Sequence, residues 1–472
     1  MNRGKELVKN TTIIFMGKFA TQFLSFFLLP IYSKFLATED YGTIDLILTY
    51  ISLLVPVITI QHEMSTFRFL IDARNNKKEI SKIITTSLKN IIICMFIFVI
   101  FFGFINYFVN FKYPYYIMLN IIVCIFSNML LQISRGLGKN INYSIASFIT
   151  GLVTFIINIV LICLLNVGAK GILISMSIGN VICIFYLFVS LKLYNYINFK
   201  KIDKKLSKEM LKYSLPLVPN GISWWFISVS DRTIVSIFLG LSANGIYAVA
   251  NKFPSIITSL LNIFNLSWSE STSLHIKDKD RDVFFSGVVE TILRLFSSLS
   301  LILIAVLPFA YDILIGKNYF DSYNYIPIFL IGTLCNCIIC VYSAIYIGLK
   351  KTKKVASTSI MSAAINLIIN LLFIRKFGLY AASLSTTIAF FSMMIYRHFD
   401  LKKTIAIKYD FKLLFSIILI MSITIIMYYI NNFYLNFVNL LIVLVFSIIV
   451  NKKTLDKVYT FFINKKRIMK LK

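Results

Sequence analysis

The sequence predicts an all-α, polytopic membrane protein. Hydrophobic residues make up 58% of its 472 residues, and charged residues make up only 14%. The apolar residues form stretches of about 20, the length that an α-helix needs to cross a hydrocarbon core roughly 30 Å thick. The loops between these stretches are short. Little of the chain therefore remains for a soluble domain, and any activity must take place within the bilayer.

About fourteen such spans follow one another along the chain. They lie near residues 10–32, 42–65, 82–106, 114–135, 142–166, 171–193, 213–239, 245–267, 284–310, 323–349, 355–374, 378–397, 411–430 and 433–451. The first span is too long for a cleaved signal peptide and lacks a small-residue cleavage site. Prolines in or near the ends of several spans predict kinked helices.

The basic residues predict the orientation. Of the 48 Lys and Arg residues, 37 fall in alternate loops and at both termini, and only 6 fall in the loops on the other side. Cytoplasmic loops carry the excess of basic residues, so we expect both termini in the cytoplasm. The net charge of +28 then reflects topology and attraction to anionic membrane lipids. Because the basic residues are spread over every inner loop, nucleic acid is not expected as a partner.

A weak internal repeat divides the chain. Phe35-Leu36 and Gly42 recur as Phe238-Leu239 and Gly245, and Ile156-Ile157-Asn158 recurs as Ile368-Ile369-Asn370. Transporters are often built from such repeats. Each unit holds an even number of spans, so both enter the membrane from the same side. The sequence therefore predicts two parallel six-helix bundles around a central cavity, plus two C-terminal helices.

The repeat sets the expected domain boundaries. They are an N-terminal bundle at 1–193, a basic cytoplasmic linker at 194–212, a C-terminal bundle at 213–398, two extra helices at 399–451 and a basic cytoplasmic tail at 452–472.

Enzymatic chemistry is not expected. The chain has no phosphate-binding glycine loop, no HExxH and no Gly-x-Ser-x-Gly motif. Cys335, Cys337 and Cys340 have no nearby His or second Cys pair to complete a zinc site, so we expect them to pack as small apolar residues. No metal or cofactor is expected. Energy must come from a gradient, the membrane potential or the concentration of the substrate.

The charges inside the spans are the candidate site, because charge in a bilayer is costly and usually faces a cavity or a partner. The substrate-binding candidates are Lys18, Asp45, Asp231, Arg232 and Lys252, and the candidate inner-gate cations are Lys89 and Arg294. Arg232 and Lys252 each lie about seven residues from the outer ends of their spans, roughly 10 Å deep, where they could converge on one anion.

Each candidate also has a structural interpretation. Lys18, Lys89 and Arg294 could extend to the interface, Asp45 and Glu63 could be interfacial, and Asp231-Arg232 could be a structural ion pair. His62 could relay protons, but packing or head-group contact is favoured. Trp224 and Trp225 are likewise expected to pack rather than to stack on a sugar.

Several local motifs carry a family resemblance. They are Lys9-Asn10, Gly17-Lys18, Pro30, Tyr32, Phe35-Leu36, Asp40-Tyr41-Gly42, Asp45-Leu46, Pro216, Pro219, Ser230-Asp231-Arg232, Gly240, Gly245-Ile246-Tyr247-Ala248 and Lys252. With these motifs and a plan of six, six and two spans, the chain resembles the Wzx-type polysaccharide-biosynthesis (O-antigen) flippases. They belong to the multidrug/oligosaccharidyl-lipid/polysaccharide (MOP) exporter superfamily, whose other branches include the MATE transporters.

The resemblance implies a function. It implies transfer of an undecaprenyl diphosphate-linked oligosaccharide from the inner to the outer leaflet of the bacterial plasma (inner) membrane, for O-antigen or capsule synthesis, by alternating access of a cationic cavity. Family members line that cavity from the first, second, seventh and eighth spans, which again selects Lys18, Asp45, Asp231, Arg232 and Lys252. The polysaccharide polymerase machinery is an expected partner. The alternatives are a cation-coupled drug or metabolite exporter of the same superfamily, and a membrane polysaccharide polymerase or ligase.

Overall fold

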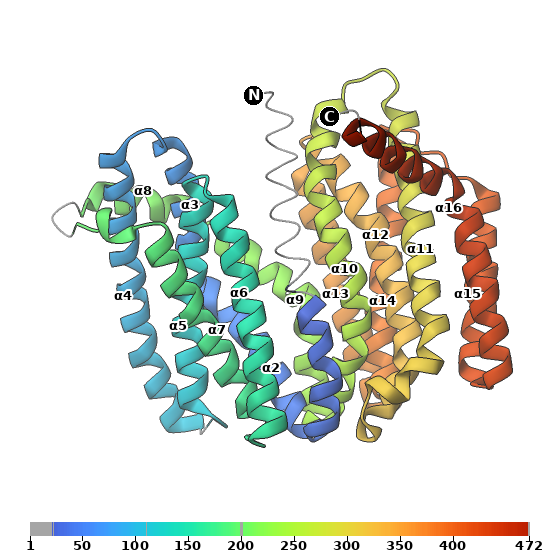
Figure 1. The fold of residues 1–472 in the computed structure, drawn as a ribbon, viewed down its shortest axis with the longest axis horizontal. Helices are drawn as coiled ribbons and strands as arrows, with labels where there is room; N and C mark the ends of the chain where they lie inside the picture. The colour runs from blue at the N-terminus through green and yellow to red at the C-terminus, as the bar shows by residue number, and fades with distance from the viewer. Residues whose placement is uncertain (1–20, 22, 110, 199–201, 471–472) are drawn as a thin grey trace. The chain divides into compact units, whose positions relative to one another are not determined.

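The computed structural model describes residues 21–470 apart from 22, 110 and 199–201, and every element in that part of the chain is a helix (Figure 1). The all-α prediction is therefore confirmed. The elements are a helix at Phe23–Phe35, α2 (Thr38–Ile58), α3 (His62–Ala73), α4 (Lys77–Val109), α5 (Pro114–Gly136), α6 (Asn140–Asn158), η1 (Ile159–Leu164), α7 (Lys170–Ser190), η2 (Leu193–Asn195), α8 (Lys204–Ser214), α9 (Leu217–Leu239), α10 (Leu241–His275), α11 (Arg281–Leu314), η4 (Lys317–Tyr325), α12 (Ile326–Gly348), α13 (Thr352–Phe377), α14 (Leu379–Lys402), α15 (Phe411–Ile430) and α16 (Phe433–Lys470).

Eleven helices in the described part of the chain are long and apolar enough to cross a membrane, so the protein is a multi-pass membrane protein. The predicted spans at 213–239 and 245–267 correspond to α9 and α10, which are not among the eleven. Most of the predicted first span lies outside the described residues.

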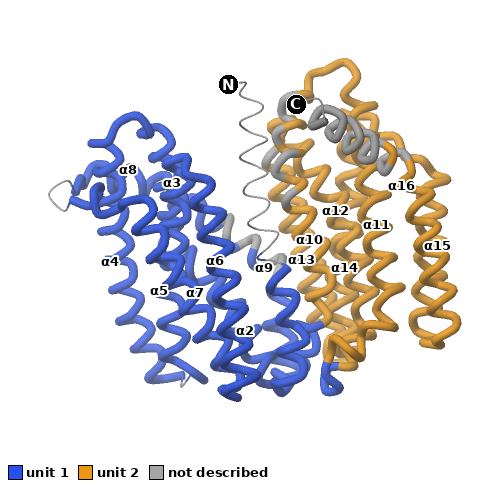
Figure 2. The backbone as a smooth tube through the Cα atoms, viewed as in Figure 1, with its two compact units in different colours: residues 1–249, 316–319 blue, residues 250–315, 320–472 orange. Residues whose placement is uncertain are grey.

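The chain packs as two compact units (Figure 2). The first unit comprises residues 1–249 and 316–319, and the second comprises residues 250–315 and 320–472. The division falls within α10, so this helix contributes its first residues to one unit and the rest to the other. The predicted repeat boundary at 194–212 stays a prediction.

Polar contacts attach the short helix α8 to α4 in the first unit. Asp203 caps α8 by accepting hydrogen bonds from two N–H groups of the first turn, and it pairs with Lys82 at 2.6 Å. The Lys82 ammonium holds the pKa of the Asp203 carboxyl below its ordinary value. Further along α8, Ser207 exchanges hydrogen bonds with Asn90, and Met210 is fully buried. The polar linker is thus fastened to the first unit by both charge and packing.

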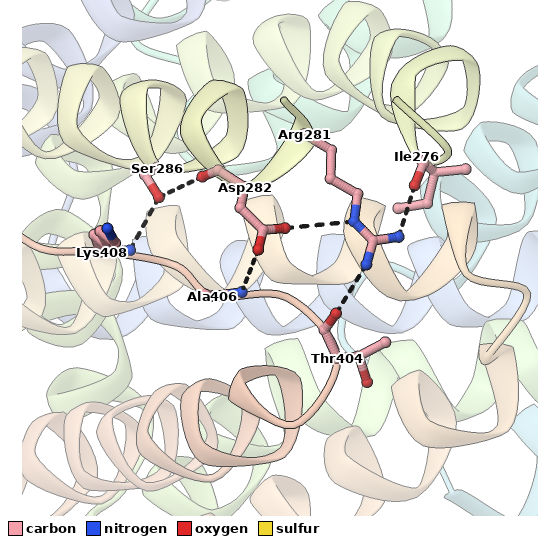
Figure 3. A network of polar contacts seen from close by, with 7 residues as sticks. All are labelled: Ile276, Arg281, Asp282, Ser286, Thr404, Ala406 and Lys408. Atoms are coloured by element: carbon pink, nitrogen blue, oxygen red, sulfur yellow. Dashed lines mark hydrogen bonds and ion pairs between the residues drawn. The ribbon is translucent and has the colours of Figure 1, made fainter. Parts of the chain in front are cut away.

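In the second unit, three side chains at the start of α11 hold the segment between α14 and α15 (Figure 3). Arg281 donates to the carbonyl of Thr404 at 3.0 Å. Asp282 accepts from the N–H of Ala406 at 3.1 Å, and Ser286 accepts from the N–H of Lys408 at 2.9 Å. Because these contacts satisfy backbone groups that no helix uses, the connection is fixed without regular structure.

Arg397 joins three helices of the second unit and is only 1% exposed. From α14 it donates to the hydroxyls of Ser343 at 2.5 Å, Thr358 at 2.9 Å and Ser359 at 3.2 Å. It also donates to one backbone carbonyl of α12 and one of α13. All five partners are neutral, so the guanidinium is stabilised by hydrogen bonds rather than by an ion pair.

Replacing Arg397 should therefore destabilise the second unit. Arg397→Ala leaves a void and several buried hydroxyls without partners, and we expect a loss of at least about 3 kcal/mol. The matched control is Lys403→Ala, which removes an exposed cation just beyond α14 and should change stability by less than about 0.5 kcal/mol. Thermal unfolding of the purified variants in detergent measures the difference. Equal melting temperatures for the two variants would contradict this role.

Candidate functional site

The structure brings two of the predicted site residues together in the first unit. Arg232 on α9 and Asp45 on α2 form an ion pair with 2.7 Å between Nε and Oδ2. Their side chains are 22% and 14% exposed. Neither of these two atoms takes part in an aligned hydrogen bond, so the contact is mainly a charge interaction. Arg232 lies seven residues before the end of α9 and Asp45 lies seven residues after the start of α2, which places both roughly 10 Å from those helix ends.

Three further contacts hold α2 against α9 along the length of both helices. The Tyr50 hydroxyl lies 3.1 Å from the hydroxyl of Thr233. The indole N–H of Trp225 donates to the carbonyl of Thr49 at 3.0 Å. The side-chain amide of Gln61, just beyond α2, donates to a carbonyl at the start of α9. From the Asp45–Arg232 pair to the contact of Gln61 with Leu217, position increases along α2 and decreases along α9, so the two helices are antiparallel.

Asp231 has a different partner from its neighbour Arg232. It is 4% exposed and accepts a hydrogen bond from the hydroxyl of Tyr247 on α10 at 3.1 Å. Successive residues of a helix point about 100° apart, so the two adjacent charges face different helices. The sequence-based alternative of an Asp231-Arg232 structural pair is therefore not what the structure shows: the carboxylate paired with Arg232 is Asp45.

Two glycines allow α2 and α10 to cross in direct backbone contact. A Cβ on Gly42 would lie 1.9 Å from the carbonyl oxygen of Leu241, and a Cβ on Gly245 would lie 2.1 Å from that of Thr38. At the same crossing, the side chain of Asn244 donates to the carbonyl of Gly42 at 2.8 Å. Gly42 and Gly245 are also partners in the repeat predicted from the sequence, which stays a prediction.

The other predicted residues lie elsewhere. Lys18 lies outside the described residues. Lys252 is half-buried on α10 in the second unit, so its convergence with Arg232 stays a prediction. Lys89 is half-buried on α4. Arg294 on α11 pairs with Glu290 and also donates to a carbonyl of α16, so its charge is already engaged within the second unit.

The break between α2 and α3 carries buried polar groups that the sequence interpretation placed near a membrane surface. Glu63 is 8% exposed and accepts a hydrogen bond from Thr59 at 2.9 Å, with no cationic partner among the described residues. His62 is 1% exposed and contacts Asn90 at 2.6 Å, which agrees with a packing role. Local hydropathy cannot reveal this burial, because it results from the left-handed backbone turn at Ile60 and Gln61.

The described residues contain no cluster of three or more His, Cys, Asp or Glu side chains that could hold a metal ion. What the site offers is one guanidinium and one carboxylate in mutual contact. Such a pair can exchange its internal partner for an external anion or cation of matching geometry.

A family profile shows to which protein family this chain belongs. The profile described as "Polysaccharide biosynthesis protein" matches residues 7–268, more than half of the chain. The chain belongs to this family. The matched range contains both members of the Asp45–Arg232 pair and the glycine crossing. No curated protein sequence matches the chain significantly.

Solved structures show which fold this family member has. The structure of this chain is similar to "Lipid II flippase MurJ, inward closed conformation", with a TM-score of 0.70. The match covers 94% of this chain and 100% of that one, at 16% sequence identity. The structure is also similar to an inward-facing "multidrug resistance MATE family transporter of the MOP superfamily", with a TM-score of 0.64 and 13% identity over 81% of this chain and 96% of that one. The fold and the family together confirm the resemblance to the MOP superfamily.

The glycine crossing generates a stability prediction. Gly42→Ala and Gly245→Ala should each force α2 and α10 apart and lower stability by about 1–3 kcal/mol or more. Gly103→Ala on α4 is the control, since nothing lies within 4 Å of its Cβ position, and it should leave stability unchanged or raise it slightly. Thermal unfolding in detergent separates these outcomes. If all three variants melt together, the backbone contact is not as close as described.

Proposed function

We propose that this protein is a flippase that moves an isoprenoid diphosphate-linked oligosaccharide across the membrane for surface polysaccharide synthesis. The observation that carries the proposal is the Asp45–Arg232 pair, held largely out of solvent between two helices of a polysaccharide-biosynthesis family member. A diphosphate cannot cross hydrocarbon unaided, and a guanidinium in a low-dielectric setting is a strong and geometrically specific partner for phosphate.

The pair gives the site two states. Without substrate, Asp45 neutralises Arg232 and removes the cost of an isolated buried charge. When substrate is bound, the diphosphate replaces Asp45 as the partner of Arg232. Because the pair lacks an aligned hydrogen bond between Nε and Oδ2, the exchange gives up little directional bonding. Lys252 and Lys18 are proposed to contribute further positive charge to substrate binding.

A cation-coupled exporter is the second candidate, and Glu63 is the observation that favours it. Within the described part of the chain this buried carboxyl has no cationic partner, which suits a cationic substrate or a coupling ion. The first candidate ranks higher because the matching family profile is that of polysaccharide-biosynthesis proteins, which favours a lipid-linked saccharide over a cationic drug. A membrane polymerase or ligase ranks lowest, since the described helices are joined by short connections.

The proposed setting is the bacterial plasma membrane with both termini in the cytoplasm, and the polysaccharide polymerase machinery would receive the product. In this orientation α8 lies at the cytoplasmic surface. Its lysines Lys204, Lys205, Lys208 and Lys212 are exposed, whereas Met210 is buried. A helix with this arrangement suits anionic lipid head groups.

Deletion of the gene should test the substrate class. A lipid-linked oligosaccharide should accumulate on the cytoplasmic face of the membrane, and surface polysaccharide should decrease. Normal surface polysaccharide with increased sensitivity to cationic drugs would instead support the exporter.

Variants of the pair should test the mechanism in the complemented strain. Arg232→Ala and Lys252→Ala should each reduce export by at least about tenfold while the protein still accumulates in the membrane. Arg232→Lys should recover part of the activity, because a point charge still attracts phosphate although the planar fork is lost. The measurement is surface polysaccharide per unit of membrane-inserted protein.

The matched control is Arg68→Ala. It breaks another Arg–carboxylate pair, Arg68–Asp72, whose side chains are 46% and 69% exposed. We expect this variant to export normally, since exposed pairs contribute little. If Arg232→Ala and Lys252→Ala together export as well as Arg68→Ala does, the cationic mechanism is excluded for this protein.

A further inference from the structure

An apolar cavity of about 700 Å³ lies in the first unit, between α2, α4 and the start of α5. This is within the size range of small-molecule sites, roughly 300–1,000 Å³. Apart from Tyr50 and Cys94, every side chain that lines it is Leu, Ile, Val or Phe. A cavity with so few polar groups does not hold ordered water, so its natural occupant is a hydrocarbon.

Aromatic rings close one wall of this cavity. The rings of Phe98 and Phe102 on α4 are 5.5 Å apart, and Phe102 stacks on Phe111 at 5.6 Å with an angle of 10° between the ring planes. Paired rings of this kind form a rigid wall. The cavity is therefore a shaped site rather than a gap that neighbouring side chains can fill by small shifts.

The same helix, α4, also gives the cavity residues that are accessible from the hydrocarbon of the membrane. Ile97 and Phe101, both on α4 and both lining the cavity, are each 61% exposed. The helix α4 is a membrane-spanning candidate, and only 11% of its apolar window is buried within the protein. A chain from the bilayer can thus enter without passing through water.

The cavity adjoins the charged site along α2. Leu46, the first lining residue, directly follows Asp45. Tyr50 also lines the cavity, while its hydroxyl contacts Thr233, the residue next to Arg232. A ligand with an anionic head at Arg232 and a long apolar chain therefore has a place for each part in the first unit, with Tyr50 contacting both the cavity and the helix that carries Arg232.

We propose that this cavity binds the isoprenoid chain of the lipid-linked substrate, an inference that rests on the proposed flippase function. The diphosphate and the chain are covalently joined, so a site for one must accommodate the other. Chains of bulk phospholipids reach the same wall, but they lack a diphosphate to hold beside Arg232. The cavity should accordingly prefer an isoprenyl diphosphate over a phospholipid.

Photo-crosslinking tests this preference. The purified full-length protein in lipid nanodiscs is irradiated with a diazirine-bearing geranylgeranyl diphosphate, and labelled peptides are identified by mass spectrometry. Label is expected on residues 46–60, in α2 and just beyond it, and on residues 94–105 of α4. A diazirine-bearing phosphatidylglycerol at the same mole fraction should label these segments about tenfold less.

Two variants on the same helix provide the structural control. Ile97→Trp fills the cavity from a lining position, whereas Ile100→Trp changes a residue of nearly equal exposure, 59% against 61%, that does not line it. Ile97→Trp should lower labelling by the diphosphate probe about tenfold, and Ile100→Trp should leave it unchanged.

The outcomes separate this inference from the proposed function. Equal labelling by the two probes, or equal labelling of the two Trp variants, overturns the cavity as an isoprenoid site, even if export requires Arg232. Preferred labelling by the isoprenyl probe that Ile97→Trp abolishes supports the cavity, even if the deletion strain exports polysaccharide normally. An absence of label in both segments overturns the proposal.

Discussion

A guanidinium within a bilayer needs a counter-charge, and in this protein Asp45 supplies it to Arg232. An unpaired charge at this depth costs about 2.5–3.5 kcal/mol or more, so the pair constrains how α2 and α9 can be arranged. Tyr50, Trp225 and Gln61 make further contacts between α9 and α2 or the residues just beyond α2, and these contacts hold the two helices in the arrangement in which the pair forms. The same requirement for a counter-charge makes the site responsive to an incoming anion.

The glycine crossing complements this constraint. Gly42 lies one turn before Asp45, and its contact with Gly245 fixes the start of α2 against the start of α10. Tyr247 on α10 then binds Asp231, which lies beside Arg232 on α9. Three helix segments are thus joined around one pair of charges by backbone contact and side-chain hydrogen bonds. If Arg232 exchanged its partner, the contacts of all three segments would change.

Hydropathy predicted nearly all of the helices, because span length and apolar composition are properties of continuous segments. The cost of membrane charge selected Asp45 and Arg232 as candidates. It could not show that they pair, since the two residues are 187 positions apart and only tertiary packing brings them together. The burial of Glu63 was missed for a similar reason, because a left-handed turn after α2 redirects the chain. The apolar cavity could not be predicted from the sequence either, because its lining residues are the apolar residues that any membrane span contains.

The most direct test of the account is the affinity of the purified protein for a short-chain isoprenyl diphosphate after Asp45→Asn. This change removes the internal competitor and leaves Arg232 without a counter-charge, so the diphosphate should bind about tenfold more tightly than to the unaltered protein. Thermal unfolding confirms that the variant is folded. If folded Asp45→Asn protein binds the diphosphate less tightly than the unaltered protein does, Arg232 does not exchange Asp45 for substrate, and the pair is structural.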